Sequence, residues 1–385
     1  RMLMMGNHFK NKTPFNKVYV HALVRDEKGQ KMSKSKGNVI DPLELINKYG
    51  ADSLRFTLIS MASPGRDVKL AKDRVIGNRN FITKIWSANN FLQLNKCKYD
   101  KKININSIKL SINQWIYNEF ILTQNLVTKS LEIFRFDEAA KCIYQFVWHY
   151  YCDWYLEFLK PIFNSKNKTE LNEARLFSSF MMSNILKLLH PFIPFFTETV
   201  WRKNNYKKII KSNLILSEWP KYKTMSKFKK NCSDINEMIK FISSLRSSKA
   251  ELKITPKLYC DIHFLEKSSK LNKIIQKNLI LAKYVGRIRN ILKLSKIDKN
   301  NFEILSQNEK ISLNFNENID LASQKIRILQ KIKNLNKEIT ALNSKLKNRA
   351  YVKNAPKEIV QNDKRFLKEL TIEDSKLRSI VSSIN

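Results

Sequence analysis

The hydrophobic positions recur every three or four residues from about Asp73 to Trp201, with almost no helix-breaking residues between them. This spacing predicts amphipathic helices packed into a bundle. A loop is expected at Pro161 and the polar stretch 164–168, and Pro191 and Pro194 predict kinks in the final helix of the bundle. The predicted helices are Asp73–Leu94, Ser111–Phe134, Asp137–Leu159 and Glu170–Trp201.

The first 77 residues carry six of the seven glycines and predict mixed structure instead. Val18–Val24 has the pattern of a strand, and Asn38–Ile40 that of a second short extended segment. A helix capped by Asp41, with proline at its first position, is expected to end at Gly50. The apolar residues 2–5 resemble an interrupted buried strand, so we expect the sequence to be part of a longer protein.

The C-terminal third combines short elements with a long heptad repeat. Ile235–Leu252 predicts a helix and Leu258–Phe264 a strand, whereas 265–318 has no clear pattern. Apolar residues at alternating steps of four and three from Leu321 to Leu346 predict a coiled-coil helix. A second helix from Pro356 would return beside it as an antiparallel hairpin. The apolar stripe of this second helix is Ile359, Phe366, Leu370, Leu377 and Ile384.

Composition narrows the class of partner. Lys and Arg number 71 against 34 Asp and Glu in 385 residues, and the net charge of +37 favours a polyanion. Lys outnumbers Arg by 55 to 16, so part of this charge reflects a bias toward Lys. No apolar run approaches the roughly 18 residues of a membrane span, and the five cysteines form no Cys-x-x-Cys pair. We therefore expect a cytoplasmic chain without a membrane span, a disulfide framework or a metal site.

The sharpest local signal is the loop Lys31–Asn38, with the sequence Lys-Met-Ser-Lys-Ser-Lys-Gly-Asn. Its three ammonium groups and two hydroxyls suit phosphate oxygens, because they are flexible donors and point charges. It lacks the glycine pattern of a Walker or dinucleotide loop. Composition alone favours the simpler interpretation, a solvated basic loop in a Lys-rich chain.

The five residues from Lys31 to Ser35 resemble the Lys-Met-Ser-Lys-Ser signature of class I aminoacyl-tRNA synthetases. Three wider segments, Val20–Pro42, Gly50–Phe56 and Gly65–Leu70, are similar to the valyl-tRNA synthetase family. In that family the amino-acid carboxylate attacks the α-phosphate of ATP, and the mobile signature loop closes over the triphosphate. The resemblance therefore implies a nucleotide-binding catalytic domain that uses ATP with Mg²⁺.

The same resemblance gives the loop residues their roles. Lys34 would be the principal catalytic contact, neutralising charge on the departing pyrophosphate, and Lys31 would assist it. The residues implied in ATP binding are Lys34, Lys31, Ser33 and Ser35.

Two stretches of the predicted bundle, Trp148–Glu157 and Leu189–Glu198, look like the anticodon-binding helical domain of the Val, Ile, Leu and Met enzymes. That resemblance implies tRNA as the partner. Taken as residues, the aromatic side chains at helical spacing in the first stretch predict core packing. His149 and His190 are expected to be structural, since no second ligand lies at metal spacing nearby.

The C-terminal hairpin is similar to the tRNA-binding arm of valyl enzymes. Between Leu321 and Arg349 the sequence has eight Lys or Arg and a single acidic residue, Glu338. The resulting net charge of +7 favours contact with tRNA phosphates over a helix face that is merely solvated. The arm residues singled out are Lys325, Arg327, Lys331, Lys333, Lys345, Lys347 and Arg349.

The sequence is thus predicted to be mainly α, with a short α/β remnant of a nucleotide-binding domain, an anticodon-binding bundle and a coiled-coil hairpin. The expected parts are 1–70 (catalytic), 71–110 (connecting helices), 111–260 (bundle), 261–318 (junction) and 319–385 (arm).

The resemblance implies valine activation and transfer to tRNA by a monomer. Neither a His-x-Gly-His element nor an editing insertion is present, so we expect the chain alone to be inactive. Three alternatives remain open: an isoleucyl or leucyl enzyme, a non-catalytic tRNA-binding module, and a coiled-coil scaffold.

Overall fold

The computed structural model describes residues 1–100, 103–264, 269–293, 302–306, 309–315, 321–348, 351 and 357–382. These residues are mostly helical, as predicted. The chain divides into two compact units, Arg1–Cys232 and Ser233–Asn385, and each is described by itself.

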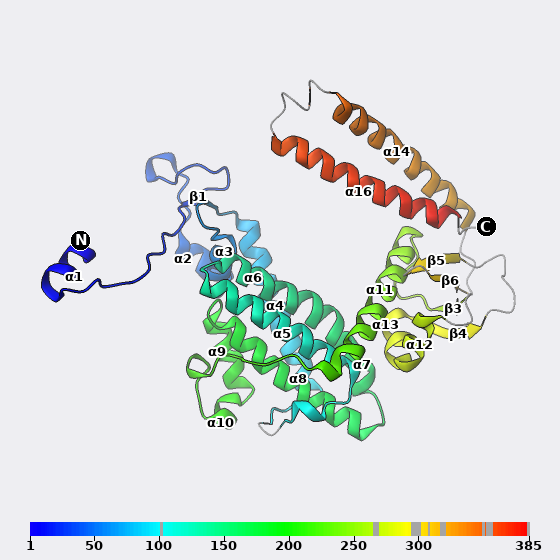
Figure 1. Cartoon of the computed structure of the whole chain (residues 1–385), viewed down its shortest axis with the longest axis horizontal. Coiled ribbons are helices and arrows are strands. Elements are labelled where there is room, and N and C mark those ends of the chain that lie inside the picture. The colour runs from blue at the N-terminus through cyan, green and yellow to red at the C-terminus, as the bar shows by residue number, and fades with distance from the viewer. Residues whose placement is uncertain are drawn as a thin grey trace. The chain divides into compact units, whose positions relative to one another are not determined.

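The first unit begins with short elements around the basic loop (Figure 1). A parallel pair of two-residue strands joins Val24 to Val68 and Arg25 to Lys69. The predicted strand at Val18–Val24 is therefore wrong except at its last residue, and residues 2–5 lie in an exposed helix instead of a strand. The elements are α1 (Met2–Lys10), β1 (Val24–Arg25), η1 (Lys34–Lys36), α2 (Pro42–Tyr49), α3 (Ala51–Met61) and β2 (Val68–Lys69).

The helix predicted after Asp41 is confirmed as α2. The Asp41 side chain accepts a hydrogen bond from Leu43 N at 2.8 Å, and Gly50 ends the helix with a φ of 89°, which favours glycine. Helices α2 and α3 share a small apolar core with the segment that follows them. Its buried members are Leu45, Leu54, Leu70 and Val75.

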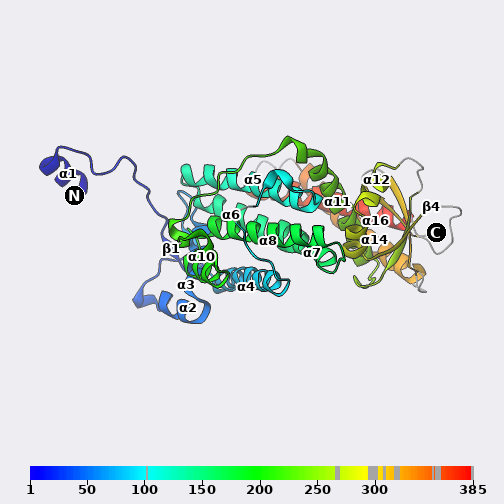
Figure 2. The ribbon, with the colours of Figure 1, turned by 90° about the horizontal axis from the view of Figure 1, so that it is seen from below.

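Helices between Lys72 and Leu189 form most of the rest of the first unit, and Figure 2 shows them side by side with nearly parallel axes. Their apolar stripes meet in a core that includes the fully buried Trp115, Tyr155, Phe158 and Phe177. The helices are α4 (Lys72–Leu94), α5 (Ser111–Glu132), α6 (Phe136–Gln145), α7 (Leu156–Phe163) and α8 (Lys168–Leu189), and α9 (Pro194–Lys203) follows them.

Two of the predicted boundaries differ from the structure. The segment predicted as Asp137–Leu159 runs from Phe136 to Phe163, with Pro161 inside α7 and a π-helical stretch, η3 (Phe146–Tyr155), in its middle. The segment predicted as one kinked helix, Glu170–Trp201, breaks at 190–193 into α8 and α9. Pro191 and Pro194 explain the break, because neither residue can donate a backbone N–H to a continuous helix.

Short elements connect α4 to α5 and lead from α9 to a further long helix. Trp219 Nε1 donates to Thr128 Oγ1 at 2.9 Å, and Tyr222 N donates to Gln124 Oε1 at 3.0 Å, so the irregular chain is held against α5. The elements are η2 (Ile105–Ser107), α10 (Tyr206–Ile210), η4 (Leu214–Leu216), η5 (Ser226–Phe228) and α11 (Lys229–Glu251), the last of which continues into the second unit.

The second unit contains a four-stranded sheet in the order β4-β3-β6-β5, and all of its strands except β3 lie within 265–318, the segment that has no clear pattern in the sequence. Strand β3 pairs parallel to β4 and antiparallel to β6, with Ile262 opposite Leu313. The predicted strand ending at Phe264 is confirmed as β3. The elements are β3 (Cys260–Phe264), α12 (Lys270–Lys277), α13 (Leu279–Gly286), β4 (Ile288–Lys293), β5 (Phe302–Ser306) and β6 (Glu309–Asn314).

Two further long helices of this unit, α14 (Leu321–Lys347) and α16 (Lys357–Ser382), pack against each other (Figure 1). Ion pairs join Lys331 to Glu373 and Lys345 to Asp363, so the helices run in opposite directions. Of the predicted stripe, Leu370 and Leu377 are buried, but Val360 is buried in place of the half-exposed Ile359 and Phe366. Ile384 lies outside the described residues. Coiled-coil packing of the pair stays a prediction.

Among the described residues, no helix is long and apolar enough to span a membrane.

The break between α8 and α9 gives the stability a pH dependence. Burial lowers the pKa of His190, although the carboxylates of Glu198 and Asp52 act in the opposite direction. The folded chain then binds this proton less readily than the unfolded chain, so stability is lost progressively as the pH falls below the ordinary value of about 6.5 toward the lower pKa of the folded state. We expect the free energy of unfolding to fall more between about pH 7.5 and 5.5 in the wild type than in His190→Gln.

Urea unfolding of both chains measures this difference. The variant His8→Gln, at an exposed position on α1, serves as the control and should keep the wild-type slope. Equal slopes for the wild type and His190→Gln would contradict the assignment.

Candidate functional site

The predicted signature loop lies between β1 and α2 as an irregular segment with one 3-10 turn, η1. Lys31 and Ser35 are exposed, Ser33 is half-buried, and the two serine Oγ atoms lie 3.2 Å apart. The backbone of Lys34 is in η1, and its side chain lies outside the described part of the structure. The described donors of the loop are therefore available for an anionic ligand.

Asn38 braces this loop across its base. Its Oδ1 accepts from Ser33 N at 2.9 Å, and its Nδ2 donates to the Lys31 carbonyl at 3.2 Å and to Asp26 Oδ2 at 2.9 Å. Asp26 Oδ1 in turn accepts from Gln30 N at 2.6 Å. The hydrogen bond from Asn38 lowers the pKa of the Asp26 carboxyl, and that from Gln30 N adds to the effect although burial opposes it.

Met32 anchors the loop from the other side. Its partly buried side chain packs on the core formed by Leu45, Leu54, Leu70 and Val75. The apolar member of the signature therefore faces the protein, while Lys31 and Ser35 are exposed. Such an arrangement can present cations and hydroxyls to phosphate groups without embedding them.

Neither Asn38 nor Asp26 is among the site residues predicted from the sequence. Both act through hydrogen bonds that depend on the folded loop, and the sequence marks them only as part of an extended segment and a turn. An asparagine three residues after the second serine, following a glycine, is the local signal that could have found the brace.

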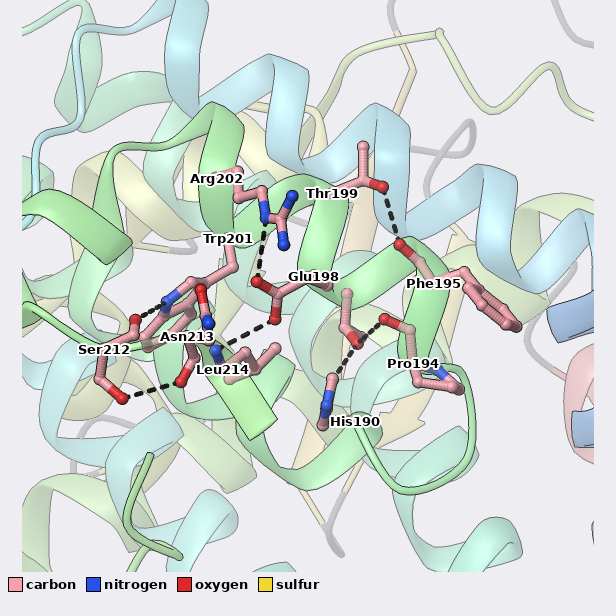
Figure 3. A network of polar contacts seen from close by, with 11 residues as sticks. His190, Pro194, Phe195, Glu198, Thr199, Trp201, Arg202, Ser212, Asn213 and Leu214 are labelled. Carbon is pink, nitrogen blue, oxygen red and sulfur yellow. Dashed lines mark hydrogen bonds and ion pairs between the residues drawn. The ribbon is translucent and has the colours of Figure 1, made fainter. Parts of the chain in front are cut away.

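The start of α9 is held by groups from distant parts of the chain. Asp52 on α3 accepts from Phe196 N at 2.6 Å, and desolvation raises the pKa of this carboxyl despite that hydrogen bond. Figure 3 shows the neighbouring contacts: His190 Nδ1 lies 2.8 Å from Thr197 Oγ1, and Glu198 accepts from Leu214 N and from Arg202 Nε, each at 3.1 Å. The prediction that His190 is structural agrees with these contacts.

An open hollow of about 450 Å³ lies on this part of the bundle. Phe195 and Ile215 on its lining are mostly exposed, whereas Glu198 and Arg202 form an ion pair with each other. Its wall is thus largely apolar with an internally neutralised charge pair.

The aromatic stretch in η3 is mainly core, as predicted. Tyr151 and Tyr155 are completely buried, and Tyr155 Oη donates to Asn113 Oδ1 at 2.8 Å. His149 is exposed and lies 3.4 Å from Asp153, beside Lys84, which stacks 3.8 Å over the Trp148 ring.

Several of the predicted arm residues have partners within their own unit. Lys331 pairs with Glu373 at 2.8 Å and with Glu251 at 3.7 Å, and Arg327 donates to the Glu251 carbonyl. Lys345 pairs with Asp363 at 2.9 Å; this hydrogen bond, together with Tyr351, raises the pKa of Lys345.

The remaining arm residues differ in exposure. Lys333 and Lys347 are exposed, Lys325 is half-buried, and Arg349 lies outside the described residues. Helix α14 carries seven Lys or Arg against one Glu, a net charge of +6, whereas α16 carries six against five. The positive charge is therefore concentrated on one helix of the pair.

Three family models match the chain in succession. The model described as tRNA synthetases class I (I, L, M and V) matches residues 1–71, and the anticodon-binding domain of tRNA ligase matches residues 113–264. The valyl tRNA synthetase tRNA binding arm matches residues 320–385. Together they cover the basic loop, the bundle and the α14–α16 pair.

Curated relatives agree along nearly the whole chain. A Pelagibacter ubique protein named "Valine--tRNA ligase" is 45% identical over 94% of this chain and 41% of its own length. A protein of the same name from Bartonella quintana is 38% identical over 98% of this chain and 42% of its own length. The chain thus spans about two-fifths of the length of the curated relatives it matches.

The brace can be tested by Asn38→Ala. Because the change removes three hydrogen bonds worth about 1 kcal/mol each, we expect the amide of Ser33 to exchange with solvent at least about tenfold faster, as measured by hydrogen exchange. Asn104→Ala, which removes a similar side-chain bond to Asn106 N in η2, is the matched control and should leave the loop unchanged. An unaltered Ser33 amide in Asn38→Ala would show that the brace does not order the loop.

Proposed function

This chain belongs to the valyl-tRNA synthetase family, and we propose that it is part of an enzyme that activates valine with ATP and transfers it to the cognate tRNA. One observation carries the proposal: the basic loop, the bundle and the α14–α16 pair follow one another in three family-matched segments, the last particular to valyl enzymes. An isoleucyl or leucyl enzyme would leave the match at 320–385 unexplained.

The ATP site is proposed on Lys34, Lys31, Ser33 and Ser35. The described donor set consists of an ammonium group and hydroxyls, which fit phosphate oxygens, and Mg²⁺ would reach the site bound to the phosphates of the nucleotide. Lys34, assisted by Lys31, would stabilise negative charge that develops on pyrophosphate as the valine carboxylate displaces it from the α-phosphate. The hydrogen bonds of Asn38 and the packing of Met32 would hold the backbone of the loop in place beneath these groups.

The bundle and the α14–α16 pair are proposed to bind the tRNA. The charge on α14, net +6, supports phosphate tracking along an antiparallel coiled-coil arm. Since Lys331, Lys345 and Arg327 already hold intramolecular partners, the exposed Lys333 and Lys347 are the stronger candidates for direct phosphate contact. We also propose that the chain is divided into the five parts expected from the sequence, and that the enzyme is a monomer located in the cytoplasm.

The catalytic part of the proposal is tested by Lys34→Ala in the complete enzyme. Loss of one well-placed charge donor should lower valine-dependent ATP–pyrophosphate exchange by about 10²–10³-fold while tRNA affinity stays nearly unchanged. Lys36→Ala, an exposed lysine of the same turn, is the matched control and should have a small effect. If Lys34→Ala kept full exchange activity, a non-catalytic tRNA-binding module would be the better description. The 385-residue chain alone should show no exchange.

The arm is tested by replacing Lys333 and Lys347 together with Ala. Each lost phosphate contact should reduce the slope of log affinity against log salt by about 0.7–0.9, and filter binding of tRNA at several salt concentrations measures it. The pair Lys364→Ala and Lys368→Ala removes the same charge from exposed positions on α16. Equal losses in both double variants would indicate a non-specific charge effect, and salt-insensitive binding would favour a coiled-coil scaffold.

A further inference from the structure

Two side chains of helix α3 form hydrogen bonds with the segment that leads into α9 and with its first turn. Asp52 Oδ2 accepts from Phe196 N at 2.6 Å, and Arg55 Nη2 donates to the Pro191 carbonyl at 3.3 Å. Asp52 is only 6% exposed, so its contact is shielded from water, whereas Arg55 is exposed. Both contacts join segments about 140 residues apart in the sequence.

The contact replaces a cap that α9 itself lacks. The first N–H groups of any helix have no acceptor within the helix and need one from elsewhere. The N-cap residue of α9 is Ile193, whose side chain forms no capping hydrogen bond. The carboxylate of Asp52 supplies the acceptor, and its negative charge is favourable at the positive end of the helix.

The same short helix also supports the signature loop. Leu54, two residues after Asp52, is a buried member of the core on which Met32 packs. One helix of 11 residues, α3, therefore both contributes to the core on which Met32 packs and forms the hydrogen bonds to α9. A shift of α3 relative to α9 must move the surface beneath Met32.

We propose that Asp52 is a positioning residue for the loop Lys31–Asn38: by holding α3 on the first turn of α9, it fixes the apolar surface on which the loop rests. The inference rests on the proposed function for its meaning, since it links an ATP-binding loop to a tRNA-binding bundle. The link works in both directions, so any displacement of α9 relative to α3 would also reach the loop.

The test is hydrogen exchange of the 385-residue chain, read in peptides that cover residues 30–41 and in peptides that cover α9. Asp52→Ala should speed exchange in both regions, by about tenfold in the loop, which corresponds to one hydrogen-bonded contact to a charged group. Asp52→Asn retains an oxygen acceptor for Phe196 N and should return loop exchange most of the way to the wild-type rate. Arg55→Ala, at an exposed position that leaves the core intact, should speed loop exchange by about two- to threefold.

The matched control is Glu173→Ala. Glu173 also accepts backbone N–H groups at the start of a helix, from Lys109 N at 3.0 Å and Leu110 N at 2.9 Å ahead of α5, and it lies in the same unit. It should lower stability without changing exchange in residues 30–41, and Asn38→Ala provides the positive control for a loosened loop.

The proposal is overturned if Asp52→Ala loosens α9 but leaves the loop at the wild-type rate, since Asp52 would then be a cap for α9 only. If Asp52→Ala does not fold, unchanged loop exchange in Arg55→Ala overturns it equally. Neither readout uses ATP or tRNA, so a failure here is distinct from a failure of the proposed catalytic role, which Lys34→Ala tests.

Discussion

The arrangement of the first unit depends on backbone N–H groups at helix starts that bind acceptors from distant segments. Glu173 of α8 accepts a hydrogen bond from a backbone N–H ahead of α5, and Asp52 of α3 accepts one from the first turn of α9. Glu198 of α9 accepts one from Leu214 N at the start of η4. Each of these donors would be costly to bury without a partner. The helices are therefore fixed in register by specific polar contacts as well as by apolar packing, which tolerates sliding.

The signature loop shows the same combination of specific and general forces. The side chain of Met32 packs on the apolar core beneath the loop, and Asn38 forms three directed hydrogen bonds across the base of the loop. Without the packing of Met32 the loop would have no fixed base, and without the hydrogen bonds of Asn38 its cationic groups would sample many orientations. A loop held by a few weak contacts of these two kinds can open locally without unfolding the elements on either side of it.

Periodicity predicted the long helices well, because their apolar stripes and the cap at Asp41 are local properties of the chain. It failed at Val18–Val24, whose alternation extends far beyond the two-residue strand, and at Pro161, which α7 accommodates. The buried Lys249, with Nζ donating to the Leu258 carbonyl at 2.7 Å, shows why charge patterns mislead: burial depends on tertiary partners. The resemblance singles out the loop lysines, whose role stays a prediction, whereas the roles of Asn38, Asp26 and Asp52 depend on hydrogen bonds that exist only in the folded chain.

The break between α8 and α9 has a consequence for which substitutions the chain can accept. In an uninterrupted helix the N–H of Phe196 would bond to the carbonyl four residues earlier, and no donor would remain for Asp52. Pro191 and Pro194 prevent this. Alanine at both positions would raise the local helix propensity and yet detach α3 from α9. A sequence that favours helix more strongly would therefore lose this contact. The two prolines therefore support a contact that neither of their side chains makes.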